Sequence, residues 1–316
     1  MRVVFFGTPD FAVPSLAALL AAGIDVAAVV TQPDRPRTRS HSTLLPPPVK
    51  QRAQAAGIPV LQPERPREPL FYEQLRALDA DLGVVVAYGH VLRPELLEIP
   101  RLGLVNVHAS LLPRWRGAAP IQWALLSGDA ETGVTIMRIE SGLDTGAVWH
   151  ERDTAISELD TATTLTARLA ELGAEALLEA LPRIAAGATP TPQDNVGATH
   201  APKVTRDTAR IRWDQPSAAV SCRIRAMDGA PGAWTTLAGA EIKVYGTATP
   251  GAQQATPSRD AANLPGTIIS TGSAPVVVTG DHGAVEIGEV QPAGKRRMAA
   301  AEWLRGANLP DGARFE

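Results

Sequence analysis

The chain has 316 residues, of which 45% are hydrophobic, and its formal net charge is −3. That length and hydrophobic content are enough for more than one buried core, so we expect two domains. The small negative charge excludes a chain that is basic throughout and binds nucleic acid by charge alone, but it leaves a local basic patch open. The single cysteine, Cys222, excludes an internal disulfide, and no apolar run approaches the roughly 18 residues that a membrane span needs. These features predict a cytoplasmic protein.

In chain order, the first half alternates short apolar runs with helical patterns. Strands are predicted at RVVFFG, DVAAVVT, IPVLQ, LGVVVAYG and LGLVNVH, and helices at runs such as FAVPSLAALLAAG. Continuous apolar runs separated by helices are typical of a parallel sheet that is covered on both faces. A late strand pair, GVTIMRI and GAVWHER, precedes a long amphipathic helix within residues 161–187. The pattern predicts an α/β doubly wound, Rossmann-like N-terminal domain over residues 1–187.

The composition changes after this domain. Residues 188–203 are rich in Thr, Pro, Gly, Asp and Asn, which indicates a linker. From 204 to 316, short β-like runs such as AEIKVYG, APVVVTG and GAVEIGEVQP alternate with Gly and Pro, which favours a small all-β, OB-like C-terminal barrel. Residues 203–316 hold 13 Lys and Arg against 11 Asp and Glu, so this part is net positive whereas the preceding part is net negative.

Several common cofactor signatures are absent from the sequence. GTPDFAVPS follows the first strand where a dinucleotide site would need G-x-G-x-x-G, which disfavours a nicotinamide oxidoreductase. Neither a phosphate-cradling G-x-x-x-x-G-K-[ST] nor a G-x-S-x-G motif occurs, and the six His and one Cys show no metal-ligand spacing. The sequence therefore offers no candidate metal site and no candidate for a covalent Ser or Cys mechanism.

Asn106 and His108 end an apolar run and stand two residues apart. On a strand, residues i and i+2 point to the same face, and ligands of open α/β sheets bind at the carboxyl ends of the strands. An amide and an imidazole placed together there can hold an oxyanion and move a proton. Asp144, in the Gly-flanked segment ESGLDTG, can supply a carboxylate for the imidazole. These three residues form a candidate acyl-transfer site, although by spacing alone a structural His and a turn Asp are the simpler interpretation.

Two stretches, NVHASLLPRWRGAAPIQWAL (106–125) and GVTIMRIESGLDTG (133–146), resemble the signature region of the 10-formyltetrahydrofolate-dependent formyltransferases. The segments FGTPDFAVPSLAALL, TQPDRP, VVVAYGHVL and QPAGKRRM extend the likeness over nearly the whole chain, to the members of that family that formylate methionyl-tRNA. The resemblance implies catalytic roles for Asn106, His108 and Asp144. It also implies a folate site made by Val85, Val86, Ala87, Tyr88, Gly89, Ser110, Leu111, Leu112 and Pro113.

The same resemblance implies a reaction and its partners. The formyl group of 10-formyltetrahydrofolate passes directly to the α-amine of methionine on initiator methionyl-tRNA, without a metal. Asn106 is expected to donate a hydrogen bond to the oxyanion, and a charged His108 to help hold it. Asp144 is expected to keep His108 in its working state and to help relay the proton. We expect a monomer that uses folate and tRNA and contacts no membrane.

Three groups of basic residues are candidates for contact with the tRNA, because Arg and Lys pair with phosphate and an aromatic ring can stack on a base. The first is PRWRG, the second the loop PDRPRTRSHSTLLPPPVK, and the third the C-terminal part. The loop departs from the Gly- and Lys-containing core that the family leads us to expect, so the choice of Arg39 as its key contact stays open. The candidates are Arg35, Arg37, Arg39, Arg114, Trp115, Arg116, Lys203, Arg206, Lys295, Arg296 and Arg297.

Other functions remain as alternatives at this point. The same formyl transfer could use a small amine, such as an amino-sugar nucleotide or glycinamide ribonucleotide, but the basic loop and the basic C-terminal part argue against it. A formyltetrahydrofolate hydrolase would use water in place of the amine. A non-catalytic RNA-binding protein on an α/β scaffold would have no need of Asn106, His108 and Asp144 together. Fold analogy alone does not decide among these.

Overall fold

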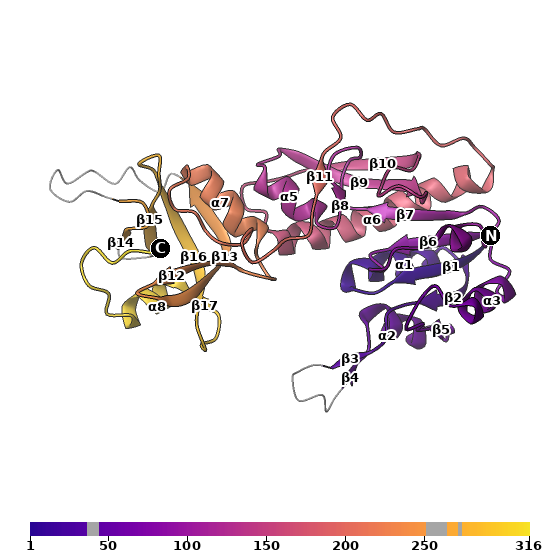
Figure 1. Cartoon of the computed structure of the whole chain (residues 1–316), viewed down its shortest axis with the longest axis horizontal. Helices are drawn as coiled ribbons and strands as arrows, with labels where there is room; N and C mark the ends of the chain where they lie inside the picture. The colour runs from indigo at the N-terminus through magenta and orange to yellow at the C-terminus, as the bar shows by residue number, and fades with distance from the viewer. Residues whose placement is uncertain (37–43, 251–263, 271–273) are drawn as a thin grey trace. The chain divides into compact units, whose positions relative to one another are not determined.

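The computed structural model of the chain describes residues 1–36, 44–250, 264–270 and 274–316, and they form two compact units (Figure 1). The first unit comprises residues 1–117, 133–154 and 166–200. The second comprises residues 118–132, 155–165 and 201–316. The segments 118–132 and 155–165, which we expected within the N-terminal domain, therefore group with the C-terminal part of the chain.

The first unit contains a seven-stranded sheet in the order β10-β9-β7-β6-β1-β2-β5. Strands β5, β2, β1, β6 and β7 are paired parallel, and β9 runs antiparallel to β7. The apolar runs of the sequence form these strands because their side chains are covered on both faces of the sheet. The bounds are β1 (Arg2–Gly7), β2 (Asp25–Val30), β5 (Val60–Leu61), β6 (Leu82–Val86), β7 (Leu104–His108), β9 (Glu131–Arg138) and β10 (Val148–Ala155).

Helices pack on this sheet through their apolar faces. α1 (Val13–Ala21) buries Leu16 and Leu19, and α6 (Ala162–Ala185) crosses close to β7. A side chain at Gly173 of α6 would meet Val107 Cγ1 at 2.8 Å, so only a glycine permits this approach. The remaining short elements are η1 (Asp10–Ala12), β3 (Arg35–Pro36), β4 (Leu44–Leu45), α2 (Pro48–Ala55), α3 (Pro69–Ala77) and α4 (Pro94–Leu97).

The second unit holds an antiparallel sheet in the order β12-β13-β16-β15-β14, with β17 paired to β16. The prediction of an all-β C-terminal part is wrong, because α7 packs against β13 and α8 follows β17. The OB-like assignment stays a prediction. The bounds are α5 (Pro120–Leu126), α7 (Ser217–Ala226), β12 (Ala233–Leu237), β13 (Ala240–Pro250), β14 (Ile268–Ser270), β15 (Pro275–Val278), β16 (Ala284–Pro292), β17 (Met298–Ala299) and α8 (Ala300–Gly306).

The predicted linker is tied to the first unit over part of its length. Thr191 and Val148 exchange backbone hydrogen bonds of 2.7 and 2.8 Å, and Thr199 N donates to Pro113 O. Further on, the two-residue strands β8 (Arg116–Gly117) and β11 (His200–Ala201) pair with each other. Among the helices that the structure describes, none has the length and apolar character to span a membrane.

Candidate active site

Asn106 and His108 lie at the carboxyl end of β7, as their spacing predicts. Asn106 stands opposite Val85 of β6 and Met137 of β9, and His108 stands opposite Thr135 of β9. Asn106 is half-buried and His108 is 5% exposed. The carboxyl end of β6 lies alongside, so the segment 87–89 and these two side chains share one edge of the parallel sheet.

Both ring nitrogens of His108 have identifiable neighbours. Nε2 lies 3.0 Å from the carbonyl oxygen of Trp115, and Nδ1 lies 3.7 Å from Oδ2 of Asp144. Because a carbonyl oxygen only accepts hydrogen bonds, Nε2 carries the hydrogen and Nδ1 of the neutral ring is bare. The same Oδ2 atom accepts a 2.8 Å hydrogen bond from Gly117 N. The family resemblance, rather than the spacing, pairs Asp144 with the imidazole, and in the structure the two groups lie close together.

The environment of His108 favours its neutral form. Burial lowers the pKa of His108, while the Asp144 carboxylate and the bond to the Trp115 carbonyl act in the opposite direction. Burial is the largest of these effects. Burial thus favours the neutral ring in the free protein, and the expectation that a charged His108 helps to hold the oxyanion during transfer stays a prediction.

The segment of the predicted folate site after β6 has an irregular backbone. Ala87 has a φ of +47°, and Gly89 has a φ of +83°. The carbonyl oxygen of Tyr88 accepts hydrogen bonds from Thr8 Oγ1 at 3.1 Å and Gln32 Nε2 at 3.0 Å. Ala87 and Gly89 are exposed. Sequence reasoning missed Thr8 and Gln32, which hold this segment in place.

The other part of the predicted folate site is held by Thr135. This buried hydroxyl donates to Ser110 O at 2.8 Å and accepts from Leu112 N at 3.1 Å. Its oxygen also lies 3.0 Å from Glu151 Oε1. Ser110 is itself fully buried and donates to Arg114 O at 2.6 Å. Ser110 is thus held inside the turn, whereas Leu111 and Pro113 are half-buried.

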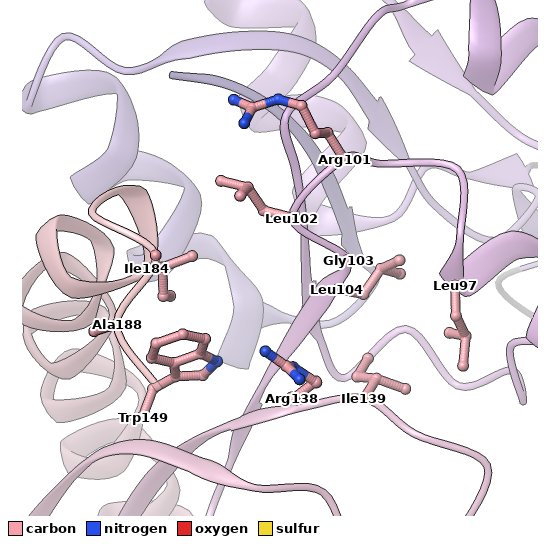
Figure 2. Close-up of a pocket in the computed structure, with 11 residues that line it drawn as sticks. Leu97, Arg101, Leu102, Gly103, Leu104, Arg138, Ile139, Trp149, Ile184 and Ala188 are labelled. Carbon is pink, nitrogen blue, oxygen red and sulfur yellow. The ribbon is translucent and has the colours of Figure 1, made fainter. Parts of the chain in front are cut away.

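A cavity of about 390 Å³ lies elsewhere in the first unit (Figure 2). It surrounds the beginning of β7, with Leu104, Arg138, Trp149 and Ile184 among its walls. Asn106 and His108 stand at the other end of β7, so this cavity is separate from the candidate catalytic residues. Among the described residues, no three His, Cys, Asp or Glu side chains gather in a way that could hold a metal ion.

Residues 1–181 match the model of the formyl transferase family, and residues 203–308 match the model of the formyl transferase C-terminal domain. The chain belongs to the formyl transferase family. The methionyl-tRNA formyltransferase of Methylococcus capsulatus is 49% identical to it over 96% of each chain. The enzyme of the same name from Thermobifida fusca is 48% identical over 100% of this chain and 99% of its own.

A solved structure also shares the fold of this formyl transferase. It is the N-formyltransferase from Helicobacter canadensis in complex with folinic acid and dTDP-3-aminofucose. The two match with a TM-score of 0.69 over 92% of this chain and 99% of that chain, at 17% identity. At that identity the likeness concerns the fold alone.

The basic residues beside the active site of this formyl transferase differ in exposure. Arg114 is exposed and stacks over the Trp115 ring at 5.0 Å, but Trp115 is only 8% exposed. Arg116 is 6% exposed, and its guanidinium donates to Gln193 Oε1 and Asn195 Oδ1. These contacts make Arg116 a weak candidate for contact with phosphate, because its hydrogen-bonding groups are already used within the fold. The buried Trp115 ring offers little surface for stacking on a base.

The basic loop is described only in part. Arg37 and Arg39 lie outside the described residues. Arg35 is exposed, and its guanidinium donates to Gln32 Oε1, the side chain that also holds Tyr88 O. Lys50 forms a 2.8 Å ion pair with Asp34, which removes one cation from those the loop could offer to phosphate.

The C-terminal basic candidates fall into two groups. Arg206, Arg296 and Arg297 pair with carboxylates, namely Glu241, Glu302, and both Asp228 and Glu289. Arg297 also lies 4.4 Å over the Tyr245 ring, so its guanidinium is held by the fold. Lys203 and Lys295 are exposed, and within the described part of the chain their side-chain amines have no carboxylate at ion-pair distance. The two lysines are thus the cations of this group that are most accessible to a phosphate backbone.

Proposed function

We propose that the chain transfers the formyl group of 10-formyltetrahydrofolate to the α-amine of methionine on initiator methionyl-tRNA. The observation that carries this proposal is the full-length similarity to enzymes named methionyl-tRNA formyltransferase, at 48–49% identity. The geometry of the candidate site supports it, because Asn106, His108 and Asp144 meet at the carboxyl edge of the sheet. The product is N-formylmethionyl-tRNA, the form that initiates translation.

The donor fits beside the catalytic side chains. Ala87 and Gly89 expose peptide groups next to Asn106, and Leu111 and Pro113 offer apolar surface after β7. Polar backbone on one side and apolar side chains on the other suit a ligand with a flat heterocycle and an aromatic linker. When bound, 10-formyltetrahydrofolate supplies an activated formyl group. The residues of the chain then position that group and stabilise the charge that develops on it.

Asn106 stabilises the developing oxyanion in this proposal. Its amide is half-buried at the end of β7, so a hydrogen bond from it acts where water is partly excluded. Loss of a single donor of this kind costs about 3 to 4 kcal/mol of transition-state stabilisation in other acyl-transfer enzymes. Asn106 donates through its side-chain NH₂ group to the formyl oxygen as that oxygen gains negative charge.

His108 and Asp144 handle the proton that the attacking amine loses. The bare Nδ1 of neutral His108 accepts this proton, directly or through one water. The imidazolium that forms faces Asp144 Oδ2, 3.7 Å away, and keeps its Nε2–H bond to the Trp115 carbonyl. Asp144 therefore stabilises the positive charge of His108, which exists only once the reaction has begun. An interaction that is stronger in the transition state than in the ground state speeds up the chemical step. His108 acts first as a base and then as an acid: as the bond between the formyl carbon and the folate nitrogen breaks, the imidazolium returns the proton to that nitrogen, directly or through water, and tetrahydrofolate is released.

The tRNA is proposed to contact exposed cations of both units. Arg35 and Arg114 belong to the first unit, and Lys203 and Lys295 to the second. Paired guanidiniums such as Arg297 and Arg206 contribute less, because contact with phosphate would require them to leave their carboxylates. Arg37 and Arg39 remain candidates by charge. Such contacts depend on salt, since phosphate neutralisation releases counterions.

An acceptor panel tests the proposed function. The full chain is incubated with 10-formyltetrahydrofolate and, in turn, with initiator methionyl-tRNA, an amino-sugar nucleotide, glycinamide ribonucleotide, or no acceptor. We expect formyl-methionine on the tRNA and, with the small amines, transfer no faster than the rate without acceptor. If transfer to one of the small amines were faster than transfer to the tRNA, that amine would be the acceptor and the proposed function would be wrong. Release of formate at the same rate without any acceptor would identify a hydrolase.

A further inference from the structure

We propose that Gln193 is a positioning residue that fixes the loop carrying Asp144, and that buried Arg116 fixes Gln193 in turn. This inference rests on the proposed function for its kinetic consequence, but its geometry does not depend on the identity of the substrate. Gln193 comes from the segment 188–203, which the sequence indicates as a linker. The structure brings it across to the catalytic carboxylate of the first unit.

The side-chain amide of Gln193 has all of its hydrogen-bonding capacity in use. Its Nε2 donates to the carbonyl oxygens of Asp144 at 2.9 Å and Gly146 at 2.7 Å. Its Oε1 accepts from Arg116 through Nε at 3.1 Å and through Nη2 at 2.7 Å. A carboxamide has two N–H donors and two acceptor lone pairs, so these four bonds satisfy it completely. If the amide were flipped, its NH₂ group would face the Arg116 donors and its oxygen would face the two carbonyl oxygens. The network therefore fixes the orientation of the amide.

The loop that Gln193 holds needs external support. Asp144 has a φ of +52°, the left-handed conformation that costs energy for a residue with a side chain. Gly146 packs so closely on the end of β9 that a Cβ there would lie 1.8 Å from Arg138 O. The Asp144 carboxylate receives one more bond, from Gly117 N. The two bonds from Gln193 thus restrain Asp144, which has the strained conformation, and Gly146.

Arg116 explains why the amide stays in place. Its guanidinium is almost fully buried and donates a third bond, from Nη1 to Asn195 Oδ1 at 3.1 Å. A buried cation must have its donors satisfied, so the bonds from Arg116 fix Gln193 and Asn195 beside the turn that follows β7. Arg116 adjoins Gly117, whose N–H binds the Asp144 carboxylate. Arg116 and Gly117 therefore both restrain Asp144. Gly117 N–H binds its carboxylate directly, and Arg116 acts through Gln193, which binds its backbone carbonyl.

The inferred role predicts an effect on His108 as well as on rate. The Asp144 carboxylate raises the pKa of His108 against the effect of burial. If the loop relaxes and the carboxylate moves away, the pKa of His108 falls further below its ordinary value. The imidazolium formed during transfer is then less stable, which lowers turnover. Substrate affinity should change little, because the hydrogen bonds that Gln193 makes toward the site end on the backbone of the Asp144 loop.

Two substitutions separate the two halves of the network. Gln193→Met keeps the size of the side chain and removes all four bonds. Gln193→Glu keeps acceptors for Arg116 but sets a carboxylate oxygen against the carbonyls of Asp144 and Gly146. Asp194→Asn is the matched control, since Asp194 is exposed and its carboxylate accepts a hydrogen bond from the nearby Val196 N. All variants are studied as the full chain, and their thermal midpoints are compared with that of the wild type.

Turnover with saturating substrates and the NMR titration of His108 are both measured. We expect both Gln193 variants to lose about 10²-fold in kcat, the cost of small misplacements in other active sites, with the KM for tRNA within about twofold. The titration midpoint of His108 should fall in Gln193→Met, which adds no charge, and the control should match the wild type in every measurement. Normal kcat in both variants, an unchanged or raised His108 midpoint in Gln193→Met, or loss of the folded state in both variants would overturn the proposal.

The titration uses the free protein, so its result is independent of the proposed function. If wild-type protein fails to formylate methionyl-tRNA while the His108 midpoint falls in Gln193→Met, the function is wrong and the positioning role stands. If wild-type protein is active and the midpoint does not move, the positioning role is wrong and the function stands.

Discussion

At the scale of single residues, the fold assigns His108 a protonation state. Its ring is 5% exposed, and burial lowers its pKa more than Asp144 raises it. The Trp115 carbonyl selects the tautomer with hydrogen on Nε2. Burial thus favours the neutral ring, and the bond to Trp115 leaves Nδ1 bare, which is the form that the proposed role as a base requires.

The depressed pKa of His108 makes stability depend on pH. The unfolded chain protonates this ring near pH 6.5, whereas the folded chain does so only at lower pH. His108 therefore favours folding above about pH 6.5, and this contribution is lost as pH falls toward the folded pKa. We expect the thermal midpoint of wild type to exceed that of His108→Gln by less at pH 5.5 than at pH 7.5.

Differential scanning calorimetry of the two proteins at both pH values measures this difference. His200→Gln serves as the control for the removal of an imidazole, because His200 is exposed. A difference between wild type and His108→Gln that grows toward acid pH would mean that the ring is stabilised as a cation.

The sequence predicts the proximity of Asn106 and His108 because a strand repeats every two residues. The apolar runs of the sequence also predict parallel strands, and therefore predict that Asn106 and His108 lie at the carboxyl edge of the sheet. The neutral state of His108 depends on burial, which spacing does not reveal. Gln193 is 77 residues from Arg116 and reads as a linker residue, so only tertiary contacts identify its position.

At the scale of elements, α7 shows what composition did not reveal. Its sequence, SAAVSCRIRA, has no clear apolar stripe, and the Gly- and Pro-rich runs around it favour strands. Its start is secured from outside: Asp281 Oδ2 accepts from Ser217 N at 3.0 Å and from Ser217 Oγ at 3.1 Å. Asp281 thus satisfies an N–H at the first turn that the helix itself cannot pair.

Asp281→Asn tests this contact. Bonds from Thr279 Oγ1, and then from the backbone of Ser217 and Gly283, lower the pKa of Asp281 to about 2. The carboxylate therefore stabilises the fold above about pH 4, and this contribution is lost as pH falls toward 2. We expect a loss of about 1 kcal/mol or less at pH 7, typical of a helix cap on a partly exposed group.

Urea unfolding followed by the far-ultraviolet circular dichroism signal gives this free energy at pH 7 and pH 3. The exposed Asp311, changed to Asn, is the control. A loss of equal size at both pH values would show that the charge of Asp281 is not what matters. No loss at pH 7 would show that the cap is not needed.

At the scale of the whole molecule, each unit is built from segments that are separated in the sequence. α5 lies between β7 and β9 in the chain, yet it packs against α7 of the second unit. A change of composition along the chain marks one boundary between two continuous segments. It cannot show that residues 118–132 and 155–165 group with residues 201–316. Asn106, His108, Asp144, Arg116 and Gln193 nevertheless all belong to the first unit.

The central claim is that Asn106, His108 and Asp144 of this chain carry out formyl transfer to methionyl-tRNA. Single-turnover transfer from labelled 10-formyltetrahydrofolate to initiator methionyl-tRNA, measured for wild type, Asn106→Ala, His108→Ala and Asp144→Ala at saturating protein, tests it most directly. We expect each variant to transfer at least about 10²-fold more slowly, the cost of losing one transition-state contact, while tRNA affinity stays within about twofold. A variant that keeps near-normal transfer would contradict the role of that residue, and normal transfer by all three would place the chemistry elsewhere in the molecule.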